Sequence, residues 1–251
     1  PRRGSGVLGS LVRRAAAIVH RWTAGLDPSI AAKEVRRRRE FFYDAFMALS
    51  FNEIDGDYAE FGCSGGMTFA HAYHEAARHR HGARLWAFDS FQGLPRPAGD
   101  ADAHPKWVEA TMATALDQFH RDCAHHGVPR AAYEVVPGFY RDSLAAMGPA
   151  EEPTNIALAY VDCDLYSSTK EVLRFLIPRL KHGMIIAFDD YFCWSASQVS
   201  GERLAMLESF SDGRWELVPY VQFGWHGMSF VVEDRRLTAH VVTRGRGASP
   251  A

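Results

Sequence analysis

The chain has 251 residues, of which 47% are hydrophobic and 23% charged, and its formal net charge is −2. These values are typical of a globular domain and disfavour a disordered chain or a general nucleic-acid binder. No run of about 18 apolar residues occurs, so we expect no stable membrane insertion. The cysteines are scattered without a CxxC pair, at Cys63, Cys123, Cys163 and Cys193. This spacing predicts reduced thiols in a cytoplasmic protein rather than a disulfide framework or a zinc site.

Residues 1–50 are predicted to form an N-terminal helical arm. Aromatic and aliphatic residues recur at helical spacing over residues 29–50, and basic patches occur at Arg13–Arg14 and Arg36–Arg39. Such patches are more typical of solvated helix faces than of a contact with a membrane surface or a polyanion. We expect the arm to pack against a partner subunit or to cover a functional site.

Strands and helices are predicted to alternate through the rest of the chain. Apolar runs predict strands over residues 58–61, 84–88, 133–136, 156–161 and 184–188. Helical periodicity predicts helices over 67–80, 108–125, 140–147, 168–180 and about 198–210. Residues 215–218 and 228–232 are predicted to pair as a terminal hairpin.

This order of elements predicts an α/β fold. We expect a doubly wound, mostly parallel, Rossmann-like sheet with an antiparallel edge hairpin over residues 51–240, preceded by N-terminal helices and followed by a flexible tail over residues 241–251. The segment 93–105 is rich in Pro, Gly and Asp and is long enough to form a lid.

A glycine turn, Gly62–Gly66, ends the first predicted strand and begins a helix. Glycines let the backbone approach a ligand, and a helix N-terminus supplies free N–H groups. The order Gly-x-x-Gly-Gly departs from the dinucleotide pattern. Glu60 beside the turn suits a ligand with an ammonium group, and Asp89 after the next strand suits ribose hydroxyls. Together they favour S-adenosylmethionine, although Asp89 alone is also typical of a helix cap or a turn.

Carboxylates follow two further apolar strands. Asp162 comes after residues 156–161, and Asp189 and Asp190 come after residues 184–188. Parallel neighbouring strands would bring these groups together, and a hard cation such as Mg2+ would relieve their repulsion. The alternative is that Asp189 or Asp190 caps a helix while Asp162 bonds backbone amides.

A metal ion beside a methyl donor predicts activation of an alcohol for methyl transfer. A carboxylate near the metal can accept the proton of that alcohol. Asp162 and Asp164 are the candidate bases, and His226 is a further candidate.

Several segments resemble the macrocin/mycinamicin-type sugar O-methyltransferases of antibiotic biosynthesis. The resemblance covers about residues 55–210 and lies in Tyr58–Gly66, Trp86–Pro95, Pro137–Leu144, Val161–Thr169 and Phe188–Tyr191. It implies a class I methyltransferase fold, S-adenosylmethionine as donor, Mg2+ at Asp162, Asp189 and Asp190, and methylation of a sugar hydroxyl. The cofactor-binding residues expected in or next to these segments are Glu60, Phe61, Gly62, Ser64, Gly66, Thr68, Asp89, Ser90, Phe91, Gly138 and Phe139.

The resemblance leaves the acceptor open, since the regions that shape its pocket match poorly. An oligosaccharide or polysaccharide is as compatible as a natural-product glycoside, and a homo-oligomer is expected. Trp107, Trp194, Trp225 and His104 are candidates for stacking on sugar rings, although each is also typical of a core residue. Two other functions remain open: a metal-dependent methyltransferase for catechol-like acceptors, and a non-catalytic subunit that binds S-adenosylmethionine.

Overall fold

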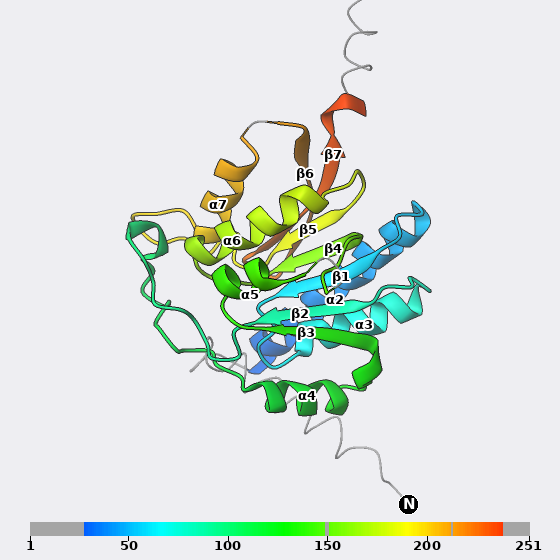
Figure 1. Cartoon of the computed structure of the whole chain (residues 1–251), viewed down its shortest axis with the longest axis horizontal. Helices are drawn as coiled ribbons and strands as arrows, with labels where there is room; N and C mark the ends of the chain where they lie inside the picture. The colour runs from blue at the N-terminus through cyan, green and yellow to red at the C-terminus, as the bar shows by residue number, and fades with distance from the viewer. Residues whose placement is uncertain (1–27, 149–150, 212, 238–251) are drawn as a thin grey trace, which may run out of the picture.

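The structure is a computed structural model that describes residues 28–148, 151–211 and 213–237. Within these residues the strands form one seven-stranded sheet in the order β3-β2-β1-β4-β5-β7-β6 (Figure 1). The strands are β1 (Asp57–Phe61), β2 (Leu85–Asp89), β3 (Tyr133–Pro137), β4 (Ile156–Val161), β5 (Ile185–Phe188), β6 (Trp215–Phe223) and β7 (Gly227–Asp234). The first five run parallel, and β7 is antiparallel to both β5 and β6. The predicted fold class, including the antiparallel edge hairpin, is confirmed.

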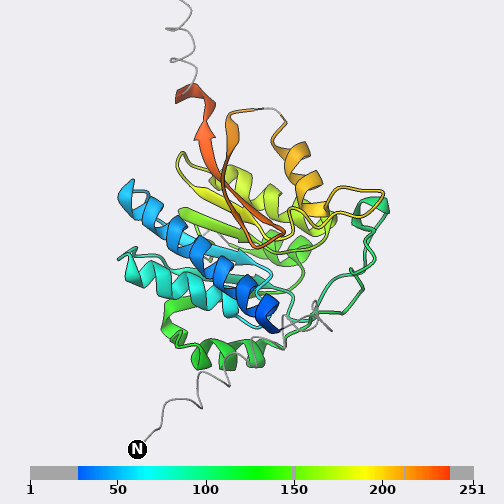
Figure 2. The ribbon, with the colours of Figure 1, turned by 180° about the vertical axis from the view of Figure 1, so that it is seen from behind.

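Helices cover both faces of the sheet. They are α2 (Pro28–Phe51), α3 (Met67–Arg78), α4 (Leu116–His125), α5 (Tyr140–Ala146), α6 (Tyr166–Leu176) and α7 (Gly201–Ser209). Helices α5, α6 and α7 lie in front of the sheet in Figure 1, whereas α2 and α3 lie in front of it in the reverse view of Figure 2. All six residues of β4 are buried, as expected for a central strand covered on both faces.

Helix α2 belongs to the same hydrophobic core as the sheet. Phe41, Phe42 and Phe46 are buried in a cluster that includes Tyr58 of β1 and Tyr160 of β4. The rings of Phe42 and Tyr160 lie 5.3 Å apart. The second half of the predicted N-terminal arm therefore packs directly on the sheet, while its residues 1–27 lie outside the described residues, as does the predicted tail.

The predicted helix over residues 108–125 begins eight residues late, at Leu116. Residues before it are tied to the preceding loop instead: the Leu94 N–H donates to the Thr111 carbonyl at 3.0 Å, and the Ala110 N–H donates to the Leu94 carbonyl at 2.9 Å. Ala110 and Met112 have positive φ angles of 56° and 61°. These long-range hydrogen bonds replace the helical ones that the apolar pattern predicts.

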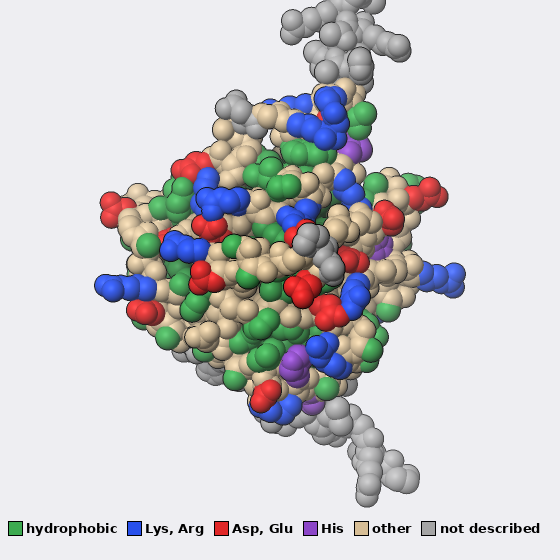
Figure 3. Space-filling view, in the orientation of Figure 1, with side chains coloured by type: hydrophobic (Ala, Val, Ile, Leu, Met, Phe, Trp, Pro, Cys, Tyr) green, Lys and Arg blue, Asp and Glu red, His purple; other side chains and the backbone are tan. Residues whose placement is uncertain are grey.

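The surface over α5, α6 and α7 carries both signs of charge. Lys and Arg side chains are interspersed with Asp and Glu on the face shown in Figure 3, without a continuous basic area. In the described part of the chain, no helix is both long and apolar enough to cross a membrane. All four cysteines are buried, and none of them forms a disulfide.

Gly62 lies at the close approach between the ends of β1 and β4. Its φ angle is +94°, and a Cβ added there would lie 1.8 Å from the backbone oxygen of Asp162. Both a strained backbone and a clash with main-chain atoms therefore oppose any side chain at this position. The first glycine of the turn is required by the sheet itself.

We expect Gly62→Ala to lower the free energy of unfolding by at least about 2 kcal/mol, because neither the φ angle nor the Asp162 backbone can adapt cheaply. Urea denaturation measures this loss. Gly82→Ala is the matched control, since a Cβ at Gly82 meets nothing within 4 Å. Equal stabilities of the two variants would contradict the packing described here.

Candidate active site

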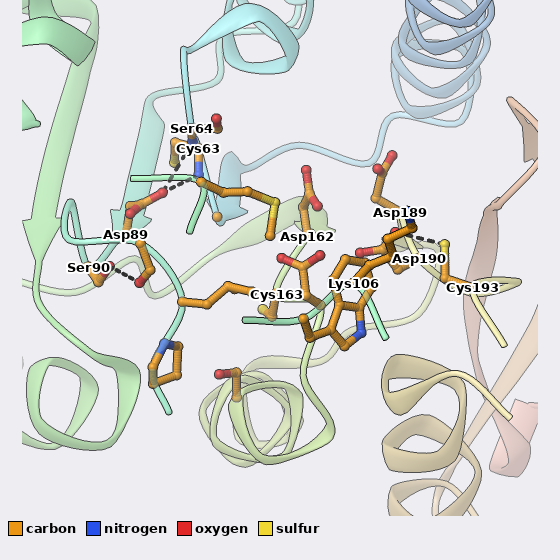
Figure 4. Close-up of a pocket in the computed structure, with 18 of the residues that line it drawn as sticks. Cys63, Ser64, Asp89, Ser90, Lys106, Asp162, Cys163, Asp189, Asp190 and Cys193 are labelled. Carbon is orange, nitrogen blue, oxygen red and sulfur yellow. Dashed lines mark hydrogen bonds between the residues drawn. The ribbon is translucent and has the colours of Figure 1, made fainter. Parts of the chain in front are cut away.

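A cavity of about 1160 Å³ opens at the carboxyl ends of the parallel strands. Figure 4 shows Cys63, Ser64 and Asp89 on one side of this cavity, Asp189 and Asp190 on the other, and Asp162 between them. The carboxyl edge of an α/β sheet is where such folds bind ligands, next to the point at which the strand order reverses. Here the reversal falls between β1 and β4.

Asp89, at the end of β2, organises the glycine turn. One carboxylate oxygen accepts hydrogen bonds from the backbone N–H groups of Cys63 at 2.7 Å and Ser64 at 3.2 Å (Figure 4). The other accepts from the backbone N–H of Phe91 at 2.7 Å. Burial raises the pKa of Asp89, although these three bonds oppose the shift. The carboxylate therefore fixes the backbone that faces the ligand.

Glu60 lies beneath the turn and is fully buried. Thr68 Oγ1 donates to one carboxylate oxygen at 2.5 Å, and Tyr58 Oη donates to the other. Burial raises the pKa of Glu60 to about 8, although both hydrogen bonds favour its ionised form. Glu60 does not line the cavity. In this structure its carboxylate binds Tyr58 of β1 and Thr68 at the start of α3, whereas the sequence predicts contact with a ligand ammonium group.

The other predicted cofactor residues divide into two sets. Residues on the cavity wall are Gly62, Ser64, Thr68, Asp89, Ser90, Gly138 and Phe139. Phe61, Gly66 and Phe91 lie behind that wall. Phe61 stacks on Phe88 with ring centroids 4.6 Å apart, and Phe91 packs on Phe119. Gly66 has a left-handed conformation at the start of α3, with φ 68°.

Three carboxylates converge on the other side of the cavity. One oxygen each from Asp162, Asp164 and Asp190 lies within 4.8 Å of the others. The register of β4 and β5 explains this convergence, because Val161 pairs with Phe188 and the acids follow directly. Asp164 turns back toward the group through a positive φ angle of 62°. Three oxygen donors at this spacing fit a hard divalent cation.

The charge of this cluster is costly without a cation. Burial raises the pKa of Asp162, and repulsion from Asp189 and Asp190 raises it further. Burial also raises the pKa values of Asp164 and Asp190, again with the neighbouring carboxylates as the next cause. The three groups therefore favour either shared protons or a bound cation, and the donor set fits Mg2+.

Glu202 of α7 holds the two acidic strand ends together. This fully buried carboxylate accepts from the backbone N–H of Cys163 at 2.9 Å and from that of Asp190 at 2.9 Å. The sequence analysis missed this residue, because the contact joins positions 39 residues apart and no local pattern marks it.

Asp189, which also borders the cavity, is bound by Arg38 of α2 and does not converge with the other three carboxylates. Its oxygens accept from Arg38 Nε at 3.0 Å and Arg38 Nη2 at 2.8 Å, and Tyr160 Oη donates to the first of them. Burial raises the pKa of Asp189, but the Arg38 charge, the neighbouring His226 and the hydrogen bonds from Arg38 and Tyr160 together hold it at about 2. The structure thus groups Asp164, in place of the predicted Asp189, with Asp162 and Asp190. The sequence also places Arg38 within a basic patch interpreted as solvated, whereas its side chain is largely buried.

His226 uses both ring nitrogens. Its Nε2 lies 3.0 Å from Arg38 Nη2, and its Nδ1 lies 2.5 Å from the Asp189 carbonyl oxygen. Because Arg38 can only donate, Nε2 must accept and Nδ1 must carry the proton. The imidazole is therefore neutral, and in this arrangement neither nitrogen is free to act as the predicted base.

This combination of sheet order, glycine turn and acidic strand ends defines a class I O-methyltransferase fold. The O-methyltransferase NovP aligns with a TM-score of 0.61 and 20% identity over 78% of this chain and 79% of its own. The calicheamicin methyltransferase CalS11 aligns with a TM-score of 0.60 and 19% identity over 92% and 94%. TomG from Streptomyces achromogenes, solved with S-adenosylmethionine, aligns with a TM-score of 0.52 and 11% identity over 91% of each chain.

Comparison of the amino-acid sequence with protein families identifies the family of this chain. The model of the macrocin O-methyltransferase (TylF) family matches residues 10–206, and the chain belongs to this family. An 8-demethyl-8-(2,3-dimethoxy-alpha-L-rhamnosyl)-tetracenomycin-C 4'-O-methyltransferase of Streptomyces olivaceus is 30% identical over 43% of this chain and 42% of its own. Mycinamicin III 3''-O-methyltransferase of Micromonospora griseorubida is 28% identical over 43% of each. The chain thus matches less than half the length of these curated relatives.

The raised pKa of Glu60 predicts a pH dependence of stability. Between the ordinary value of 4.5 and about 8, the folded state holds a proton that the unfolded state has released, so stability falls as the pH rises through this window. We expect the free energy of unfolding of the wild type, relative to Glu60→Gln, to fall by up to about 1.4 kcal/mol per pH unit there.

Urea denaturation of both proteins at pH 5.5 and pH 8.5, without added ligand, tests this prediction. A constant difference between the two proteins at both pH values would show that Glu60 keeps an ordinary pKa.

Proposed function

We propose that the protein is a Mg2+-dependent O-methyltransferase that moves a methyl group from S-adenosylmethionine to a sugar hydroxyl. The acceptor would be an oligosaccharide, a polysaccharide or a natural-product glycoside. One observation carries the proposal: a single cavity joins the glycine turn to three converging carboxylates. Family membership and the sugar-modifying relatives support it.

The donor would bind on the side of β1 and β2. The backbone of Gly62–Gly65 would face its amino-acid end, and Asp89 would accept from its ribose hydroxyls. The oxygens of Asp89 already accept backbone bonds, but each has a further lone pair for this purpose. Gly138 and Phe139, which follow β3 and line the same wall, would flank the adenine. The solved TomG complex with S-adenosylmethionine supports this choice of donor.

The acid cluster would hold the metal through Asp162, Asp164 and Asp190. A bound Mg2+ would supply positive charge that lowers the pKa of an acceptor hydroxyl. The proton of that hydroxyl would pass to a carboxylate of the pair Asp162 and Asp164, which border the donor side. Arg38 would keep Asp189 ionised as a fixed negative charge behind the site. Water exclusion would fall to the loop 93–112, of which Leu94 and Trp107 line the cavity.

Calorimetric titration with S-adenosylmethionine and with Mg2+ tests both cofactors, and a methyl-transfer screen over sugars, glycosides and catechols tests the acceptor class. We expect donor binding and transfer to a sugar hydroxyl that is lost on removal of Mg2+ by a chelator. Absence of donor binding, or transfer only to catechols, would reject the proposal.

The composition of the metal site gives a separate prediction. We expect Asp164→Asn to weaken Mg2+ binding by at least about tenfold, or ~1.4 kcal/mol, because it removes one of three converging oxygens. The double variant Arg38→Gln/Asp189→Asn removes a whole ion pair and leaves no unpaired buried charge. It should change the Mg2+ affinity less than Asp164→Asn does.

Calorimetric Mg2+ titration of each folded variant measures the affinities. If the double variant loses at least as much Mg2+ affinity as Asp164→Asn, Asp189 is a metal ligand. The ion is then not held by Asp162, Asp164 and Asp190 alone.

A further inference from the structure

One face of α2 lines the cavity beside the acid cluster. Ile30, Glu34 and Arg38 are spaced four residues apart, so they lie on the same side of the helix, and all three border the cavity. The Arg38 guanidinium bonds Asp189 at the end of β5. This contact places the preceding turn of the helix, with Glu34, next to the metal-binding side of the cavity.

Glu34 carries a buried oxygen without a partner. The residue is 7% exposed, and its Oε2 has no hydrogen-bond partner in the described part of the chain. Arg38, one turn along, is already bound to Asp189 and His226. Buried carboxylate oxygens in folded proteins normally have donors. Oε2 itself is enclosed against Gly224, but Glu34 lines the cavity, so rotation of its carboxylate would offer this oxygen to a donor on a ligand. A carboxylate accepts hydrogen bonds, so that ligand must present hydroxyl or ammonium hydrogens.

The turn between β6 and β7 packs against Glu34. A Cβ added to Gly224 would lie 2.5 Å from Glu34 Oε2, so the glycine leaves the space that the carboxylate occupies. Arg37 Nη1 donates to the Gly224 carbonyl at 3.0 Å, and Arg38 contacts His226 at 3.0 Å. These contacts hold the turn firmly against α2.

Trp225, the next residue of this turn, is 59% exposed and also lines the cavity. Its ring meets His226 edge-on, with centroids 4.7 Å apart. A largely exposed indole is costly in water, but it suits the apolar C–H face of a pyranose. The Glu34 carboxylate and the exposed Trp225 ring are therefore close together, because Glu34 packs on Gly224 and Trp225 is the next residue.

We infer that Glu34 and Trp225 form the subsite for the acceptor sugar, an inference that rests on the proposed function. The Glu34 carboxylate accepts hydrogen bonds from hydroxyls of a neutral pyranose, and the Trp225 ring covers the C–H face of that sugar. The reacting hydroxyl then points toward Asp162, Asp164 and Asp190. Neither residue transfers a proton; both select and orient the sugar.

The ammonium group of S-adenosylmethionine is the competing donor for Glu34. The sheet order separates the two sites, because β4 and β5 lie between β1 and β7. Three strand spacings amount to about 14 Å. The glycine turn follows β1, whereas the turn that touches Glu34 precedes β7, so Glu34 belongs to the acceptor side.

The test uses saturation-transfer NMR titration of the protein, loaded with S-adenosylhomocysteine and Mg2+, with methyl rhamnoside, glucoside and mannoside. We expect at least one glycoside to bind the wild type and to bind Glu34→Ala and Trp225→Ala roughly tenfold more weakly. Glu40→Gln is the matched control, because this exposed residue of α2 pairs with Arg36 on the helix surface. It should bind like the wild type.

Two further measurements separate the possible failures. Donor affinity, measured by calorimetry, should be unchanged in Glu34→Ala; a matching loss of donor affinity assigns Glu34 to the ammonium group and overturns the inference. The thermal stability of Glu34→Met should equal or exceed that of the wild type, because an unpartnered buried oxygen is removed. A large loss of stability instead gives Glu34 a structural role and also overturns it.

Different results would reject the acceptor subsite and the proposed methyl transfer. If the wild type binds no glycoside of the panel, or if Glu34→Ala methylates its sugar acceptor with an unchanged KM, the subsite is wrong while methyl transfer stands. If the wild type transfers no methyl group to any sugar, the proposed function falls, and the subsite falls with it.

Discussion

Negative charge gathered at the carboxyl ends of β4 and β5 is the constraint on which the site depends. Carboxylates this close repel one another strongly in a poorly solvated interior. Two protein groups relieve part of this repulsion. Arg38 neutralises Asp189, and the backbone amides of Cys163 and Asp190 bind Glu202. Among the described residues, no Lys or Arg side chain binds the remaining three carboxylates, and a ring nitrogen of His226 lies 3.9 Å from an Asp190 oxygen, which leaves protons or a metal to relieve the rest of the repulsion.

The same constraint fixes the position of α2. The helix carries the Arg38 charge, and Phe42 anchors it on the sheet against Tyr160. Arg38 also fixes the tautomer of His226, so one guanidinium determines the ionisation of an aspartate and the proton position of a histidine. A helix that the sequence assigns to a separate arm is thus part of the site wall.

The sequence predicts what depends on local pattern. Buried strands appear as apolar runs, and carboxylates just after them must lie at one edge of a parallel sheet, so the acid cluster and the glycine turn are predictable. Contacts that join distant positions are not. In the sequence, Arg38 cannot be distinguished from the arginines beside it. Only the orientation of α2 on the sheet determines that Arg38, and not one of its neighbours, faces the site. Glu202 acts on backbone amides that carry no sequence signal.

Contacts between distant positions also explain two differences between the predicted and the observed structure. Asp189 and Asp190 are adjacent and chemically identical, and both border the cavity, yet Asp189 binds Arg38 of α2 whereas Asp190 converges with Asp162 and Asp164. The late start of α4 at Leu116 reflects hydrogen bonds from the segment before it to Leu94, which lies far back in the sequence. The hydrophobic periodicity of residues 108–125 cannot predict a hydrogen bond to Leu94, which lies outside that segment.

The contact between α2 and the β6–β7 turn has a consequence for engineering this scaffold. Gly224 leaves room for the Glu34 carboxylate, while Arg37 bonds the Gly224 carbonyl, so each segment is shaped to the other. A larger residue at Gly224 alone would enter the space that Glu34 occupies, and a new α2 alone would remove the hydrogen bond from Arg37. A chimaera designed for a new acceptor must therefore exchange the helix and the turn as one unit.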